Sequence, residues 1–281
     1  MDRCYTYTVK LRPLAEGGYG VIVPSLPGFG FSGPVQQTGV NFVRTADLWR
    51  TLMQEILGYG RFAAHGSDWG AAVTAQLGHK YADQLVGIHL TGTYPLNLFS
   101  AERPWDPVGP LLPSVEGEVR QELLARDRRS ASHLAVHILD PQTLAYAMHD
   151  SPVGLCAWLL ERRRAWSDCH GNVETRFTKD ELLTAMMIYW ATDTFGSSAR
   201  FYREAAERPW EPSHDGSPVV EAPTAISVFI RDVPALSSRK SYDSYYNLHY
   251  INEWSSGGHF AAAEEPNAVV YDLRAAFRSL R

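Results

Sequence analysis

Gly66-Ser67-Asp68-Trp69-Gly70 is the stretch that decides the fold of this 281-residue chain. The apolar run at residues 61–65 precedes it and suits a buried parallel strand, and the good helix formers of residues 71–80 follow it. A nucleophile on a sharp strand-to-helix turn needs small residues two positions before and after it, and only the frame centred on Asp68 meets that condition. Centring the turn on Ser67 would put two large side chains at those positions. The sequence therefore predicts a carboxylate at the tip of the turn, with an ordinary helix N-cap as the alternative interpretation.

The composition is that of a folded protein with one large domain, or a core with an insertion. Hydrophobic residues make up 45% and charged residues 20% of the chain. A formal net charge of −5 indicates neither nucleic-acid binding nor a basic membrane patch. No run approaches the roughly 18 apolar residues of a membrane span, and the first residues lead into no apolar core of a secretory signal. We therefore expect a soluble protein.

The three cysteines, Cys4, Cys156 and Cys169, are too scattered for a disulfide framework. No C-x-x-C pair offers a metal site, so neither a metal nor a cofactor is expected. A reducing cytoplasm is the expected compartment.

Strand and helix patterns alternate along the first and last parts of the chain. Short apolar or β-branched runs predict strands at 19–24, 61–65, 85–90, 225–230 and 249–254. Helical spacing of apolar residues predicts helices at 43–57, 71–80 and 264–280. This alternation is typical of a parallel, right-handed α/β sheet.

The middle of the chain has a different residue pattern. After proline-rich loops, helical stretches are predicted at 116–137, 141–149, 153–166 and 179–206, and no strand pattern interrupts them. We expect a helical cap over residues 96–215, inserted into an α/β core made of residues 1–95 and 216–281.

The loop after the first predicted strand is constrained by its prolines and glycines. Pro24, Pro27, Gly28 and Gly30 stiffen a backbone that ends at the carboxyl edge of the sheet. Ligands bind at that edge in open parallel sheets. We expect Phe29 to form part of a substrate-binding wall there.

Three chemically suitable side chains follow the ends of predicted strands, in the order nucleophile, acid, histidine. Asp68 can attack an electrophilic carbon and form an ester. His259, on a glycine-rich loop, can activate the water that hydrolyses the ester, and Asp232 can orient the imidazole. Taken alone, Asp232 would be a surface turn residue and His259 a structural one.

A carboxylate nucleophile suits either epoxide opening or halide displacement, and the leaving group separates the two reactions. A nascent alkoxide needs a donor such as Tyr, whose reference pKa is about 10. Halide needs N–H donors, and the Trp69 indole could serve. In either reaction the backbone N–H of Trp69 is expected in the oxyanion hole.

Several longer motifs are similar to the microsomal-type epoxide hydrolases of the α/β-hydrolase superfamily. The resemblance runs from Gly20 to the C-terminus and is carried by residues 24–32, 150–155, 189–190, 200–202 and 257–262. It implies an α/β-hydrolase sheet with a cap, Asp68 as nucleophile, His259 as base, Asp232 as its acid partner and Tyr202 as ring-opening donor. The implied substrates are an apolar epoxide and water, the implied product is a vicinal diol, and no cofactor is implied. A homodimer is compatible with this assignment.

Two departures from the family pattern affect the expected site. The first cap tyrosine of the family aligns with His133. This histidine could donate a hydrogen bond or ionise near neutral pH, or the position could simply be lost, and Tyr146 is an unaligned substitute. The family's His-Gly-x-Pro loop, which supplies the second oxyanion N–H, has no counterpart here, and its lid region and first core strands are absent too. Losing one oxyanion donor typically costs about 10² to 10³ in rate. The alternatives are a haloalkane-dehalogenase-like hydrolase, or a truncated, degenerate hydrolase with impaired activity or ligand binding only.

Overall fold

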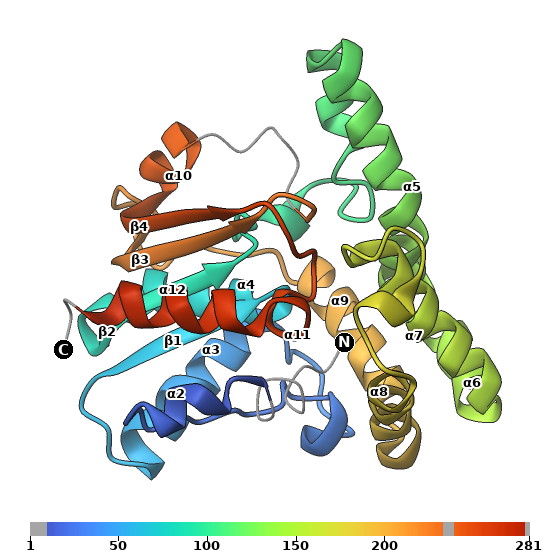
Figure 1. Ribbon diagram of the computed structural model, residues 1–281, viewed down its shortest axis with the longest axis horizontal. Helices are drawn as coiled ribbons and strands as arrows, with labels where there is room; N and C mark the ends of the chain where they lie inside the picture. Colours follow the sequence, from blue (N-terminus) through green and yellow to red (C-terminus); the bar gives the residue numbers. More distant parts are fainter. Residues whose placement is uncertain (1–9, 233–238, 279–281) are drawn as a thin grey trace.

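The computed structural model describes residues 10–232 and 239–278. Within them, four parallel strands form one sheet in the order β1-β2-β3-β4. The strands are β1 (Phe62–Ser67), β2 (Leu85–Thr91), β3 (Val220–Phe229) and β4 (Tyr246–Trp254). The predicted parallel α/β sheet is confirmed (Figure 1).

Helices cover the sheet and fill the insertion between β2 and β3. Those of the core are α2 (Arg12–Glu16), α3 (Phe42–Thr51), α4 (Trp69–Lys80), α10 (Arg239–Tyr245), α11 (Ala261–Glu264) and α12 (Pro266–Arg278). Those of the insertion are α5 (Gly117–Leu139), α6 (Pro141–Asp150), α7 (Pro152–Trp166), α8 (Lys179–Thr192) and α9 (Phe195–Glu207). In Figure 1, α5 to α8 stand to one side of the sheet, and α9 lies between them and the sheet. The boundaries 96 and 215 of the proposed cap stay predictions.

The two faces of the sheet carry separate apolar clusters because successive strand residues point in opposite directions. On β3, Ile226 and Val228 join a cluster with α3, α4 and the cap. Ala225 and Phe229 face the other way and pack with α2 and α12. The sheet is therefore covered on both faces, as parallel sheets usually are.

A buried carboxylate lies under the second face. Asp272 of α12 is 0% exposed. It accepts hydrogen bonds from Ser227 Oγ at 2.5 Å, Tyr250 Oη at 2.6 Å, Asn252 Nδ2 at 2.9 Å and Trp254 Nε1 at 2.6 Å. Four donors compensate the cost of burying this charge and tie α12 to β3 and β4.

Two local predictions are wrong, and a third differs only in its last turn. Residues 19–24 form neither a helix nor a strand, so β1 has no neighbouring strand on its outer edge among the described residues. The helix predicted at 43–57 is α-helical only to Thr51 and continues as a π-helical turn, Leu52–Ile56. The long helix predicted at 179–206 is broken at Asp193, whose φ of +50° is left-handed.

Among the helices of the described residues, none combines the length and hydropathy that crossing a membrane requires.

Candidate active site

The turn after β1 holds Asp68 in a strained backbone conformation, with φ +54° and ψ −128°. Such values are unfavourable for a residue with a side chain and cluster at functional sites. A Cβ added to Gly66 would lie 2.0 Å from the carbonyl oxygen of Gly70, so a side chain at position 66 is excluded. A Cβ on Gly70 would meet nothing within 4 Å. The steric demand for small residues therefore falls on one side of the turn only.

Asp68 is the N-cap residue of α4, but its side chain accepts no capping hydrogen bond from that helix. Its Oδ2 lies 3.4 Å from Nε2 of His259. Nδ1 of His259 lies 3.1 Å from Oδ1 of Asp232. The three side chains predicted from strand ends thus meet in one line, although 191 residues separate the first from the last.

The order of these contacts indicates which nitrogen of His259 carries the proton. With Nδ1–H donating to Asp232, the lone pair of His259 Nε2 faces Asp68, where a water attacking an Asp68 ester would stand. The side chains are 21% exposed for Asp68, 17% for Asp232 and 10% for His259. The site is therefore largely shielded but not sealed from water.

Tyr202 lies on α9, 6% exposed, with its ring edge-on to Trp69 at a centroid distance of 4.8 Å. Burial, followed by the nearby charge of Asp68, raises the pKa of Tyr202 well above its ordinary value. The phenol therefore stays protonated and is available as a hydrogen-bond donor.

The Tyr202 hydroxyl lies 2.8 Å from Nε2 of His133, which is 5% exposed on α5. Burial, and then the neighbouring His137, lower the pKa of His133 well below its ordinary value, so its imidazole is neutral. Burial also lowers the pKa of His137 to about 3. Both nitrogens of His137 and Nδ1 of His133 are buried and have no hydrogen-bond partner among the described residues.

Trp69 and Phe29, which the sequence also predicts in the site, both pack against other aromatic rings. The Trp69 ring stacks on Phe99 at 4.9 Å, and its buried Nε1 lies close enough to the Tyr202 hydroxyl to lower the pKa of Tyr202 in part, without a hydrogen bond of normal geometry. Phe29 is 1% exposed and packs edge-on against Phe201 at 5.5 Å. Its place in a substrate-binding wall stays a prediction.

Tyr146 is 69% exposed on α6, so it does not replace the first cap tyrosine. Tyr94 is not among the site residues predicted from the sequence. Its hydroxyl is close enough to Tyr202 to contribute to the raised pKa of that residue. The signal was present, because Tyr94 comes just beyond the end of β2, where side chains of a parallel sheet's active edge gather. Among the described residues, no group of three or more His, Cys, Asp or Glu side chains is arranged to hold a metal ion.

Comparison with known proteins gives consistent relatives. The chain is 39% identical over 95% of its length, and 58% of the relative's, to the "Putative epoxide hydrolase" of Stigmatella aurantiaca. It is 31% identical over 92% of its length, and 60% of the relative's, to Epoxide hydrolase 1 of Sus scrofa. The chain therefore spans about three fifths of the length of these curated relatives.

The fold has close counterparts among solved structures. The juvenile hormone epoxide hydrolase of the silkworm Bombyx mori superposes with a TM-score of 0.77 at 23% identity, over 100% of this chain and 66% of that one. This likeness concerns the fold alone. The model of the alpha/beta hydrolase fold family matches residues 7–187, more than half of the chain. The chain belongs to the alpha/beta hydrolase fold family.

Proposed function

We propose that this protein is an epoxide hydrolase that opens an apolar epoxide to a vicinal diol. The observation that carries the proposal is the convergence of a carboxylate at an elbow, a His–Asp pair and a buried, protonated tyrosine. Relatives named as epoxide hydrolases support the same activity.

In the first half-reaction, Asp68 attacks one epoxide carbon, and that carbon's bond to the ring oxygen breaks. The ring oxygen takes the proton of the Tyr202 hydroxyl, which is worth typically about 10² to 10⁴ in rate for a positioned acid. The product is an ester of Asp68 that carries the new hydroxyl group.

In the second half-reaction, water attacks the ester carbonyl while His259 Nε2 takes its proton, and Asp232 stabilises the imidazolium. Collapse of the tetrahedral intermediate releases the diol and restores the Asp68 carboxylate. The imidazolium of His259 then releases its proton to solvent, and the tyrosinate of Tyr202 takes up a proton from solvent, so that both side chains are neutral again.

We further propose that His133 supports Tyr202 rather than acting as a second independent donor. With the proton on Nε2, His133 donates to the Tyr202 oxygen and leaves the Tyr202 O–H for the epoxide. This tautomer leaves a lone pair, not an N–H, at the partnerless Nδ1. An N–H donated to the phenol oxygen stabilises the tyrosinate that forms on ring opening.

A haloalkane-dehalogenase-like activity is the second candidate, because the buried Nε1 of Trp69 could donate to a leaving halide. A halide-release assay separates the two reactions. The proposal also includes a cytoplasmic location and a homodimer, and light scattering on the purified protein tests the assembly.

The decisive test is the intact mass of His259→Gln after exposure to styrene oxide. Because water activation is blocked, the ester should accumulate, and diol formation should fall at least about 10²-fold. An Asp68→Asn control should form no adduct, and circular dichroism checks that both variants are folded. A folded His259→Gln protein that gains no mass from several epoxides would overturn the proposal.

A further inference from the structure

The loop that carries His259 has all of its backbone N–H groups occupied. This His259 loop, residues 257–260, has a single acceptor for each of four consecutive amides. The pairs are Gly257 N to Asp168 Oδ2 at 3.1 Å, Gly258 N to Glu264 Oε2 at 3.1 Å, His259 N to Trp166 O at 2.9 Å and Phe260 N to Glu264 Oε1 at 3.0 Å. The loop therefore has little freedom to move its imidazole.

Two of these acceptors belong to the insertion rather than to the core. Trp166 is the last residue of α7, and Asp168 follows two positions later. The Trp166 ring also stands edge-on to the His259 ring at a centroid distance of 5.3 Å. The base is thus held partly by the insertion that lies over it.

Glu264 connects the insertion to the core. Its carboxylate is 8% exposed and accepts a third backbone hydrogen bond, from Asp168 N at 2.7 Å. One carboxylate therefore holds amides on both sides of His259 and the backbone of the insertion. Burial raises the pKa of Glu264, whereas the three backbone N–H donors and the charge of Arg176 favour its ionised form. Hydrogen bonds to an ionised acceptor are stronger than neutral ones.

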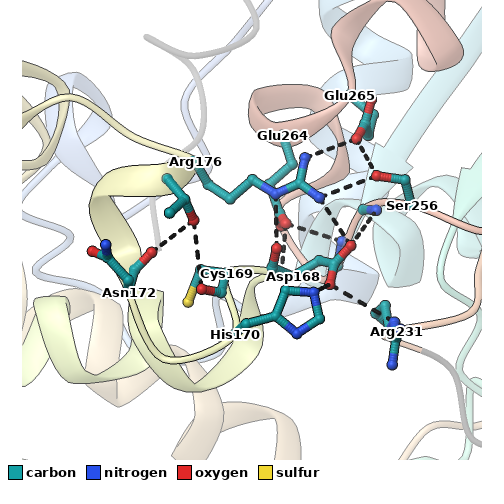
Figure 2. A network of polar contacts seen from close by, with 12 residues as sticks. Asp168, Cys169, His170, Asn172, Arg176, Arg231, Ser256, Glu264 and Glu265 are labelled. Atoms are coloured by element: carbon teal, nitrogen blue, oxygen red, sulfur yellow. Dashed lines mark hydrogen bonds and ion pairs between the residues drawn. The ribbon is translucent and has the colours of Figure 1, made fainter.

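Asp168 forms the other junction, as Figure 2 shows. Its side chain is 7% exposed and receives Arg176 Nη2 at 2.9 Å, while Arg231 Nε lies 3.7 Å from its other oxygen. Arg176 also donates to the Asp168 carbonyl at 2.7 Å and pairs with Glu265 at 2.9 Å. Arg231 directly precedes the triad residue Asp232, so Asp168 contacts the base loop and the strand end that carries the base's partner.

We propose that Glu264 and Asp168 are positioning residues for the hydrolysis of the ester intermediate, and that they act through the His259 loop. The inference rests on the proposed function and deepens it. A misplacement of about 1 Å at a reacting group can cost about 10²-fold in rate. Ester formation uses Asp68 and Tyr202, so it does not depend on where His259 stands.

A purely structural role would weaken both half-reactions alike, so the test separates them. In Glu264→Gln, the amide NH₂ replaces a carboxylate oxygen and faces backbone N–H groups that it cannot accept from, while the side-chain volume is kept. Rapid-quench intact-mass measurements with styrene oxide follow the ester in a single turnover. We expect ester formation within about threefold of wild type and ester decay slowed by about 10- to 100-fold, so that the ester accumulates.

Asp168→Asn is the second variant, because it touches the His259 loop only at the Gly257 amide and leaves Glu264 in place, although it also weakens the ion pairs of Asp168 with Arg176 and Arg231. We expect the same split between half-reactions with a smaller slowing of decay. Glu221→Gln, at a side chain 49% exposed on β3 and outside these contacts, is the matched control and should behave as wild type.

Wild-type ester decay in folded Glu264→Gln and Asp168→Asn would overturn the inference, and so would an equal loss in both half-reactions. The proposed function fails differently, through the absence of any adduct in His259→Gln. Should Glu264→Gln not fold, the split in Asp168→Asn decides alone.

Discussion

The two sides of the nucleophile turn differ sharply in how they are filled. On the side of His259, four consecutive amides and a network of buried carboxylates fix the loop. On the side of the β1 edge lies a cavity of about 520 Å³, lined by residues 19–24, the strand residues 61–67 and the turn itself. Its other walls come from α2, α3, α4 and α12.

This difference teaches that the chain fixes the His259 loop through many contacts and leaves open space beside the turn that carries Asp68. No residue of 96–215 lines the cavity, so it is not a substrate pocket between cap and core. In the proposed mechanism, the base of ester hydrolysis is therefore held by many contacts, whereas the cavity borders the turn that carries the nucleophile.

The largest loss of stability should come from a methyl group added to the His259 loop, on the filled side of the turn. In Gly258→Ala, the new Cβ would lie 2.7 Å from Trp166 O and 2.8 Å from Asp168 N. Both are backbone atoms that cannot turn away, so the contact between the insertion and the His259 loop must open. We expect a loss of about 3 kcal/mol in the free energy of unfolding, measured by urea denaturation.

The same variant should also hydrolyse the ester more slowly while forming it normally. Equal stability of Gly258→Ala and wild type would mean that the two segments are not held as tightly as the contacts indicate.

The insertion, which contacts the His259 loop through Trp166 and Asp168, should also make stability depend on pH through His137 of α5. The pKa of His137 falls from 6.5 to about 3 in the folded protein because the ring is buried. An unfolded chain binds the proton below pH 6.5 while the folded protein does not, so stability is lost as the pH falls from 6.5 towards 3. At about 1.4 kcal/mol per pH unit, this one residue should cost about 2 kcal/mol between pH 6.5 and 5.

His137→Leu, which has a similar volume and no titrating group, should remove that part of the pH dependence in urea unfolding at pH 7 and pH 5. Replacing His249, which is exposed on β4, is the control and should leave the dependence unchanged. An unaltered slope in His137→Leu would show that the ring is not held neutral.

Most of the sheet could be predicted from the sequence, because buried parallel strands are short apolar runs whose pattern is local. The strands around residues 61–65, 85–90, 225–230 and 249–254 all exist, extended by a few residues. The run at 19–24 is also rich in β-branched residues but is no strand, although the outer edge of β1 is unpaired among the described residues and both segments line the same cavity. Pairing of this kind cannot be read from one segment.

The residues of the candidate site also differ in whether the sequence predicts them. Asp68, Asp232 and His259 could be predicted because a parallel sheet brings the carboxyl ends of its strands together. The contacts of Glu264 and Asp168 could not be predicted, because both carboxylates accept from backbone amides, which every residue except proline carries, so the sequence does not indicate which amides they meet. The contact between His133 and Tyr202 depends on how α5 packs against α9, which the apolar pattern of either helix leaves open.

The smallest change in stability should come from Gly20→Ala, the matched substitution on the side of the turn where the cavity lies. A Cβ there would have Tyr59 Oη as its nearest neighbour, at an ordinary 3.6 Å, and the φ of Gly20 is not in the left-handed region. Alanine restricts the unfolded chain more than glycine does, so we expect a gain of about 0.4 to 1 kcal/mol in urea denaturation rather than a loss. The opposite signs of Gly20→Ala and Gly258→Ala would express the contrast between the two sides in one measurement. A loss above about 1 kcal/mol in Gly20→Ala would instead mean that residues 19–24 are packed closely in solution and that the cavity beside β1 is filled.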